Sequence, residues 1–144
     1  MLPPFNADGN LPEGIHQASL TEVLARFGVG SARRKWLGDR MGELLSHAKT
    51  TGKLHRVFLW GSYVTAKKSP NDLDLLLVMA EDFSLDQLRQ EQRVLFDHAQ
   101  ARIRFQADVF WTKVSIGQET LELWLDTYQV SKDLNRRGIV EVIS

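Results

Sequence analysis

Two aspartates open an otherwise apolar segment of this 144-residue chain, because Asp72 precedes the run Leu73 to Met79 and Asp74 interrupts its start. Alternate side chains of a β-strand share a face, so the two carboxylates would lie on one face, about 7 Å apart along the strand. Burying two repelling carboxylates without a partner is costly, but at a strand end beside a loop they stay accessible. Mg²⁺ prefers one or two protein carboxylates together with phosphate oxygens of a substrate. We therefore expect both acids to bind a metal.

A Gly61-Ser62 pair ends the preceding apolar run, with nine residues between Ser62 and Asp72. Glycine permits a sharp turn and a close approach of the backbone to a ligand. Ser62 is expected to cap a short helix, and the free N–H groups of a helix start attract phosphate. The segment therefore predicts a site for a metal-bound nucleoside triphosphate. The residues expected to bind the nucleotide are Gly61, Ser62, Lys67 and Lys68.

The composition sets limits on the protein that carries these residues. Hydrophobic residues make up 43% and charged residues 25% of the chain, which is typical of one soluble globular domain. There are no cysteines, so disulfides, thiol nucleophiles and cysteine-ligated zinc are excluded. The formal net charge of +0 gives no overall attraction to nucleic acid or anionic lipid.

The chain also lacks the sequence features of export or membrane insertion. Its start, MLPPFNADGN, has neither a basic region nor an apolar region of the signal-peptide type. The longest apolar run, Leu75 to Ala80, falls far short of the roughly 20 residues that span a bilayer. We therefore expect a cytoplasmic protein with no membrane partner.

The N-terminal part predicts an arm followed by helices. Residues 1–18 contain three prolines and several turn formers and are expected to be irregular. Ser19 with Glu22 fits a capping box, and Ser31 begins a second helix that Gly52 ends. Residues 19–52 are therefore predicted to form a helical extension.

The period of the hydrophobic pattern then changes. Residues 55–111 are predicted to form a core that carries the motifs, with the apolar runs ending at Trp60 and Met79 as buried strands and a helix from Ser84 to near Ala99. Alternation from Ile103 to Trp111 predicts another strand. Residues 116–144 are predicted to form an amphipathic helix and a last strand. The whole chain, 1–144, then reads as one α/β (α+β) domain with a small mixed β-sheet packed against helices.

The spacing of Gly61-Ser62 and Asp72-Leu73-Asp74-Leu75 resembles the signature of the DNA polymerase β-like nucleotidyltransferase superfamily, particularly its small bacterial minimal members. The resemblance covers roughly Val57 to Trp111. It implies a nucleotidyltransferase-like fold, here with an N-terminal helical extension. It also implies a third metal-binding acid on a later strand, and the matching position is Asp108 in QADVFW.

The resemblance implies an enzyme that transfers a nucleotide from an NTP such as ATP to an acceptor hydroxyl and releases pyrophosphate. Two Mg²⁺ ions, for which Mn²⁺ can substitute, would bind the catalytic acids Asp72, Asp74 and Asp108. The acceptor stays open between a protein side chain, a small molecule and an RNA end, and a homodimer or a partner protein is compatible with the short chain.

Other interpretations stay open. Many minimal members have a basic residue and a second glycine where this chain has Thr65 and Ala66. That departure favours a non-catalytic binding or regulatory module of the same fold, such as a toxin–antitoxin component. Residues 61–74 can also be a solvent-facing loop, and Asp108 an edge-strand acid paired with an arginine. Asp97 and Asp126 are substitutes for Asp108 on predicted helices.

Several further residues are assigned structural roles. The histidines, among them His98, show no metal-binding spacing and are expected at the surface or in structural contacts. Arg33, Arg34 and Lys35 are expected to form a solvated face, with substrate binding as the alternative. Tyr63 is expected to pack inward, with stacking on a base as the alternative.

Overall fold

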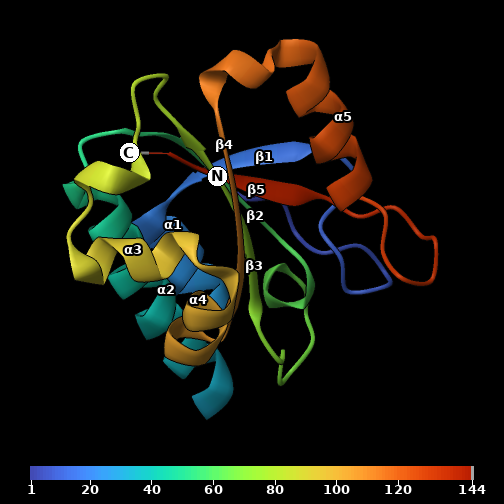
Figure 1. Cartoon of the computed structure of the whole chain (residues 1–144). Coiled ribbons are helices and arrows are strands. Elements are labelled where there is room, and N and C mark those ends of the chain that lie inside the picture. The colour runs from blue at the N-terminus through green and yellow to red at the C-terminus, as the bar shows by residue number, and fades with distance from the viewer. Residues whose placement is uncertain (144) are drawn as a thin grey trace.

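The computed structural model describes residues 1–143 as an α+β fold with one mixed five-stranded sheet in the order β1-β5-β2-β3-β4 (Figure 1). The pairs β1/β5 and β3/β4 are parallel, whereas β2 is antiparallel to both of its neighbours. The strands are β1 Ile15–Ser19, β2 Leu54–Trp60, β3 Leu73–Met79, β4 Ala107–Lys113 and β5 Ile139–Ile143. The helices are α1 Leu20–Phe27, α2 Ala32–Thr50, α3 Gln90–Phe96, α4 His98–Phe105 and α5 Gln118–Tyr128.

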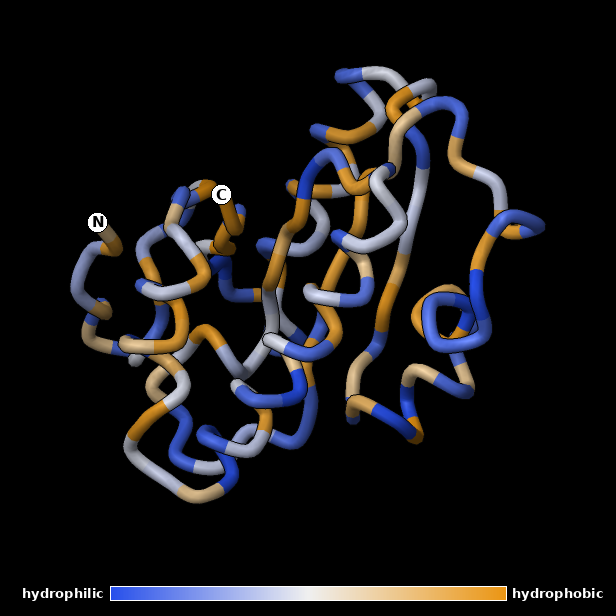
Figure 2. The backbone as a smooth tube through the Cα atoms, turned by 90° about the vertical axis from the view of Figure 1, so that its left-hand side faces the viewer, coloured by the Kyte–Doolittle hydropathy of each residue, from blue (hydrophilic) through white to orange (hydrophobic). Residues whose placement is uncertain are grey.

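Helices cover both faces of the sheet, but unequally. The helices α1 to α4 lie on one face and α5 on the other (Figure 1). The odd-numbered residues of β3, such as Leu75, pack into the larger core under α1 to α4, and Leu76 and Val78 pack under α5. In Figure 2 hydrophobic segments run through the central strands. Because β3 has apolar residues on both faces, Asp74 stands out as the polar residue within it.

The first two helices begin where the sequence predicts. The Ser19 side chain accepts a hydrogen bond from the Glu22 amide, and the Ser31 side chain accepts one from the Arg34 amide. Gly52 follows α2 with a positive φ of 71°. None of the helices within residues 1–143 has the length and the hydrophobicity that crossing a lipid bilayer requires.

Three predicted elements differ in the structure. Residues 15–19 of the expected irregular arm form β1, which the polar side chains of His16 and Gln17 concealed in the sequence. The helix predicted from Ser84 to Ala99 is divided, because the side chain of Asp97 caps a separate helix, α4. The strand predicted from Ile103 begins only at Ala107, since residues up to Phe105 belong to α4.

The alternation of apolar and polar residues from Ile103 predicted a strand where the structure has the end of α4. Phe105 and Ala101 are four residues apart and both pack into the larger core, whereas Ile103 is 85% exposed. Gln106 then adopts a left-handed conformation, with φ 53° and ψ 47°, which ends the helix. The strand that carries Asp108 follows directly from this helix end.

Candidate active site

The three predicted acids lie together at one end of the two parallel strands β3 and β4. The register pairs Asp74 with Asp108, and Asp72 lies just before β3. One carboxylate oxygen from each of the three residues lies within 4.8 Å of the others. Ala107 and Val109 pack into the larger core, so Asp108 points to the opposite face, as the sequence requires for it to meet the other acids. The three side chains are suited to share one cation.

The acid cluster is electrostatically strained. Burial, followed by the negative charges of Asp72 and Asp108, raises the pKa of Asp74 to about 7. Arg102 and Arg137 act in the opposite direction and lower this pKa. Carboxyl groups whose pKa is raised toward 7 by burial and by neighbouring acids are concentrated at functional sites. A divalent cation would relieve the repulsion.

Two residues of α4 complete the cluster and were missed in the sequence. Arg102 Nη1 is 3.0 Å from Asp72 Oδ2 and 3.3 Å from Asp108 Oδ2. His98 Nε2 is 3.5 Å from Asp108 Oδ1, so this histidine is at the site although its spacing gave no signal. The sequence left two alternatives for Asp108, a place beside the other two acids or a pair with an arginine. The structure has both. The crossover between β3 and β4 brings Arg102 to Asp72, whereas Asp108 follows α4 closely in the chain.

Gly61 occupies a conformation that only glycine adopts easily, with φ 83° and ψ −166°. A Cβ atom at this position would be 2.2 Å from Asp74 Oδ2. The sequence predicted that the backbone at this glycine closely approaches a ligand. In the structure its close neighbour is the carboxylate of Asp74. The following helix is only a 3₁₀ turn, Ser62–Val64, and is shorter than the expected helix to Lys67. The predicted cap is wrong, because Ser62 is the first residue of the turn and Gly61 holds the cap position without a side-chain hydrogen bond.

A buried arginine holds the turn in place from the start of α2. Arg34 is 5% exposed and donates five hydrogen bonds to four backbone carbonyls, those of Phe27, Tyr63, Thr65 and Lys67. Arg33 donates to the carbonyls of Pro70 and Asn71. The predicted solvated face is therefore wrong for Arg34, which is a buried positioning residue. Tyr63 is fully buried and packs inward, as predicted.

The acids and the turn line a cleft of about 940 Å³. Gly61, Ser62 and Lys67 line it as predicted, whereas Lys68 is not among its lining residues and its carbonyl accepts a hydrogen bond from Ser31. Two segments that the sequence did not indicate also line it: residues 8–10 of the N-terminal arm and residues 131–137 after α5. The second segment brings Lys132 and Arg137 to the cleft, so together with Lys67 three cations line the cleft that contains the acids.

A protein-family model, described as a family of unknown function (DUF6932), matches residues 3–143. The chain belongs to DUF6932. No curated protein and no solved structure matches it. The family match includes all five strands and every residue assigned above to the cleft.

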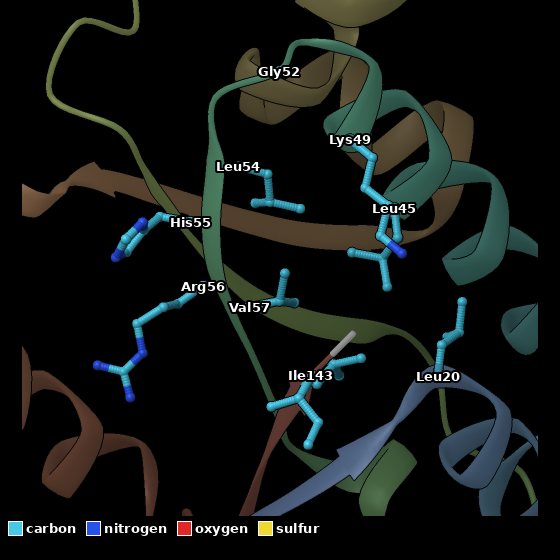
Figure 3. A pocket seen from close by; sticks show the side chains of 10 residues that line it. Leu20, Leu45, Lys49, Gly52, Leu54, His55, Arg56, Val57 and Ile143 are labelled. Atoms are coloured by element: carbon cyan, nitrogen blue, oxygen red, sulfur yellow. The ribbon is translucent and has the colours of Figure 1, made fainter.

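Two other hollows of the DUF6932 fold differ from the cleft in chemistry. One, of about 320 Å³, lies at the far end of β2 from Gly61. In Figure 3 its apolar side chains gather on one side of β2 with Lys49, whereas His55 and Arg56 extend to the other side. Arg56 is already paired there with Glu141, at 2.8 Å. The other lies against β4, is lined mainly by aromatic rings, and has a volume of about 660 Å³. Neither hollow contains a carboxylate among its lining residues, so within residues 1–143 the cleft is the place suited to a cation.

Proposed function

We propose that this protein is a metal-dependent nucleotidyltransferase that transfers a nucleotide from an NTP to an acceptor hydroxyl and releases pyrophosphate. The observation that carries the proposal is the convergence of Asp72, Asp74 and Asp108, with oxygens within 4.8 Å of one another, beside the Gly61 turn. The resemblance of the same residues to the DNA polymerase β-like superfamily supports it. The chemistry requires acids that gather cations around a phosphate, and a backbone turn that leaves room for the phosphate.

The donor set fits Mg²⁺. Three carboxylates at the ends of two strands supply hard oxygen ligands, and a cation there would oppose the burial and the acidic neighbours that raise the pKa of Asp74. Bound there, Mg²⁺ or Mn²⁺ would lower the pKa of the acceptor hydroxyl and neutralise the charge that develops on the leaving pyrophosphate. Asp72 and Asp74 would hold the cation at the triphosphate, and Asp108 would add the third ligand on the acceptor side.

The residues of the chain then position the reactants. Ser62 and the cations Lys67, Lys132 and Arg137 line the cleft and would bind the triphosphate. The acceptor oxygen bonds to the α-phosphorus while the bond from phosphorus to the β-phosphate oxygen breaks. The hydroxyl proton leaves to water in the open cleft. Positioning and charge stabilisation supply most of the catalysis in phosphoryl chemistry, so no separate protein base is required.

Calorimetric titration with ATP, with and without Mg²⁺, tests the metal-dependent binding. We expect Asp72→Asn and Asp74→Asn to abolish Mg²⁺-dependent binding, and Asp108→Asn to retain much of it but to lose nucleotide transfer. Transfer is measured with labelled NTPs and a cell lysate as the source of acceptors. Asp97→Asn and Asp126→Asn are matched controls, since Asp97 caps α4 and Asp126 pairs with Arg136. Full-rate transfer by Asp108→Asn would refute the three-acid mechanism.

One observation favours a second candidate, a non-catalytic module of the same fold, such as a toxin–antitoxin component. Arg102 pairs with Asp72 and Asp108 and so supplies a cation from the protein itself. In such a module the acids and Arg102 form a fixed ion-pair network that needs no metal. ATP binding that is independent of Mg²⁺, together with no labelled acceptor for any NTP, would favour this candidate over the enzyme.

A further inference from the structure

The hollow against β4 has the properties of a ligand groove. It lies along the outer edge of the sheet, where β4 is the last strand, with α3 and α4 to one side and α5 to the other (Figure 1). Its volume of about 660 Å³ falls within the usual range for small-molecule sites. Rings make up most of its lining: Phe96, His98, Phe110, Trp111, Trp124 and Tyr128.

Ring contacts, centred on Trp60 behind the groove, hold Tyr128, Phe110 and His98. Trp60 stacks on Tyr128 with ring centres 3.7 Å apart and planes 7° apart, and its ring centre is 6.0 Å from that of Phe110. Phe110 in turn is 5.9 Å from the His98 ring. Phe110 and Trp124 nevertheless remain 43% and 36% exposed. Exposed aromatic faces beside rings already fixed by stacking favour a flat aromatic ligand.

The groove adjoins the acid cluster. Phe110 lies two residues beyond Asp108 and shares its face of β4. His98 lines the groove, and its Nε2 is 3.5 Å from Asp108 Oδ1. The Gly61 turn follows β2, the acids belong to β3 and β4, and the groove lies at the outer edge of β4. For a nucleotide with its outer phosphates at Gly61 and its α-phosphate at the acids, the groove lies on the side of its nucleoside end, next to the acceptor side of Asp108.

We propose that the aromatic groove binds the base of the nucleotide whose phosphates lie at the acid cluster. The inference rests on the proposed function, because it assigns the direction in which the NTP lies in that site. It predicts that much of the affinity for ATP comes from the base and not from the phosphates alone.

Calorimetry with Mg–ATP and with Mg–tripolyphosphate, which has no base, measures this contribution. We expect the native protein to bind Mg–ATP at least about fivefold more tightly, as stacking of a base on an aromatic side chain provides. Trp124→Ala and Phe110→Ala should each reduce that ratio toward one while leaving the affinity for tripolyphosphate unchanged. Trp36→Ala, which removes an indole of similar exposure (41%) from α2, should leave the ratio unchanged.

Adenosine without metal separates this inference from the proposed function. We expect it to shift the Trp124 indole N–H resonance and not that of Trp36. If adenosine does so while no nucleotide binding depends on Mg²⁺, the groove is retained and the enzyme proposal fails. If Mg–ATP binds through Asp72 and Asp74 but no more tightly than tripolyphosphate, the groove assignment fails alone. Sedimentation that shows a dimer dissociated by Trp124→Ala would assign the groove to a second copy and overturn the proposal.

Discussion

Gly61 lies so close to Asp74 that a Cβ atom would not fit, and this limits the residues that the position tolerates. We expect Gly61→Ala to destabilise the protein by about 2 kcal/mol or more, because an added methyl meets the Asp74 carboxylate at 2.2 Å and the backbone conformation is strained for any other residue. It should also abolish Mg–ATP binding. Thermal melting and calorimetry measure the two effects.

Two variants give the scale for that effect. Ser62→Ala, which removes one hydroxyl from the cleft, should weaken triphosphate binding by only about 1 kcal/mol. Gly42→Ala, in the middle of α2 with open space around it, should leave melting unchanged or slightly raised. Equal, small effects of Gly61→Ala and Ser62→Ala would mean that the turn is only a connector.

Asp74 makes the stability of the metal-free protein depend on pH. Its folded pKa of about 7 lies above the ordinary value of 3.8, so the folded state binds the proton more tightly than the unfolded state. The stability that this group provides is therefore greatest below pH 4 and is lost as pH rises through 7. The melting temperature of Asp74→Asn, minus that of the native protein, should increase from pH 5 to pH 8.

The same proton competes with a metal. Below pH 7 a cation must displace it from Asp74, so the apparent affinity for Mg²⁺ should fall between pH 8 and pH 6. Asp86→Asn, an exposed acid outside the cleft, is the control for the melting series. If the difference in melting temperature between Asp74→Asn and the native protein stays constant from pH 5 to pH 8, the raised pKa of Asp74 is contradicted.

Arg102 holds the position nearest to two of the three acids, so it competes with a cation for them. We expect Arg102→Gln to lower the melting temperature without metal, because Asp72 and Asp108 lose the arginine that pairs with both of them and His98 remains near Asp108 alone. The increase in melting temperature on adding Mg²⁺ should become larger. Arg104→Gln, from the same helix, breaks a pair with Glu43 and a contact with the Phe105 ring, neither of which involves the three acids, and should show no such increase.

The start of α2 determines the shape of the cleft wall through Arg34. We expect Arg34→Met to cost about 3 kcal/mol or more, because four backbone carbonyls lose a charged donor and little water can replace it. Chemical denaturation measures the loss. Arg34→Lys should restore little of it, since an ammonium cannot reach the same carbonyls as the planar guanidinium. Lys35→Met, at the exposed next position, is the control.

Across the whole chain, the features that the sequence predicted best are those that depend on a pattern over a few residues. The caps at Ser19 and Ser31, the buried strand β3 and the orientation of Asp108 all follow from periodicity over a few residues. The α+β class follows from the alternation of such elements. Element boundaries failed where two patterns overlap, as in α4, whose Phe105 fits a strand and a helix equally well.

The parts of the site that could not be predicted are those made by distant segments. Arg102 reaches Asp72 only through the crossover, and Arg137 reaches the cleft only because the segment after α5 returns to it. The contacts of His98 and Arg102 with Asp108, nearby in the chain, were hidden because α4 extends to Phe105, where a strand was predicted. Arg34 looked like one of three exposed basic residues, since its burial depends on the turn that folds over it. No spacing rule relates residues that far apart in the chain.

The attachment of the Gly61 turn has a consequence for how the protein opens. Arg34 bonds it to α2, and the Ala66 amide donates to the Gly9 carbonyl of the N-terminal arm. The turn can therefore separate from the rest of the fold only if both attachments are released. We expect the Ala66 amide to exchange its hydrogen with solvent as slowly as the amides of β3, as hydrogen–deuterium exchange can measure. A cleft wall of this kind does not act as a lid, so nucleotide would enter a site that is already formed.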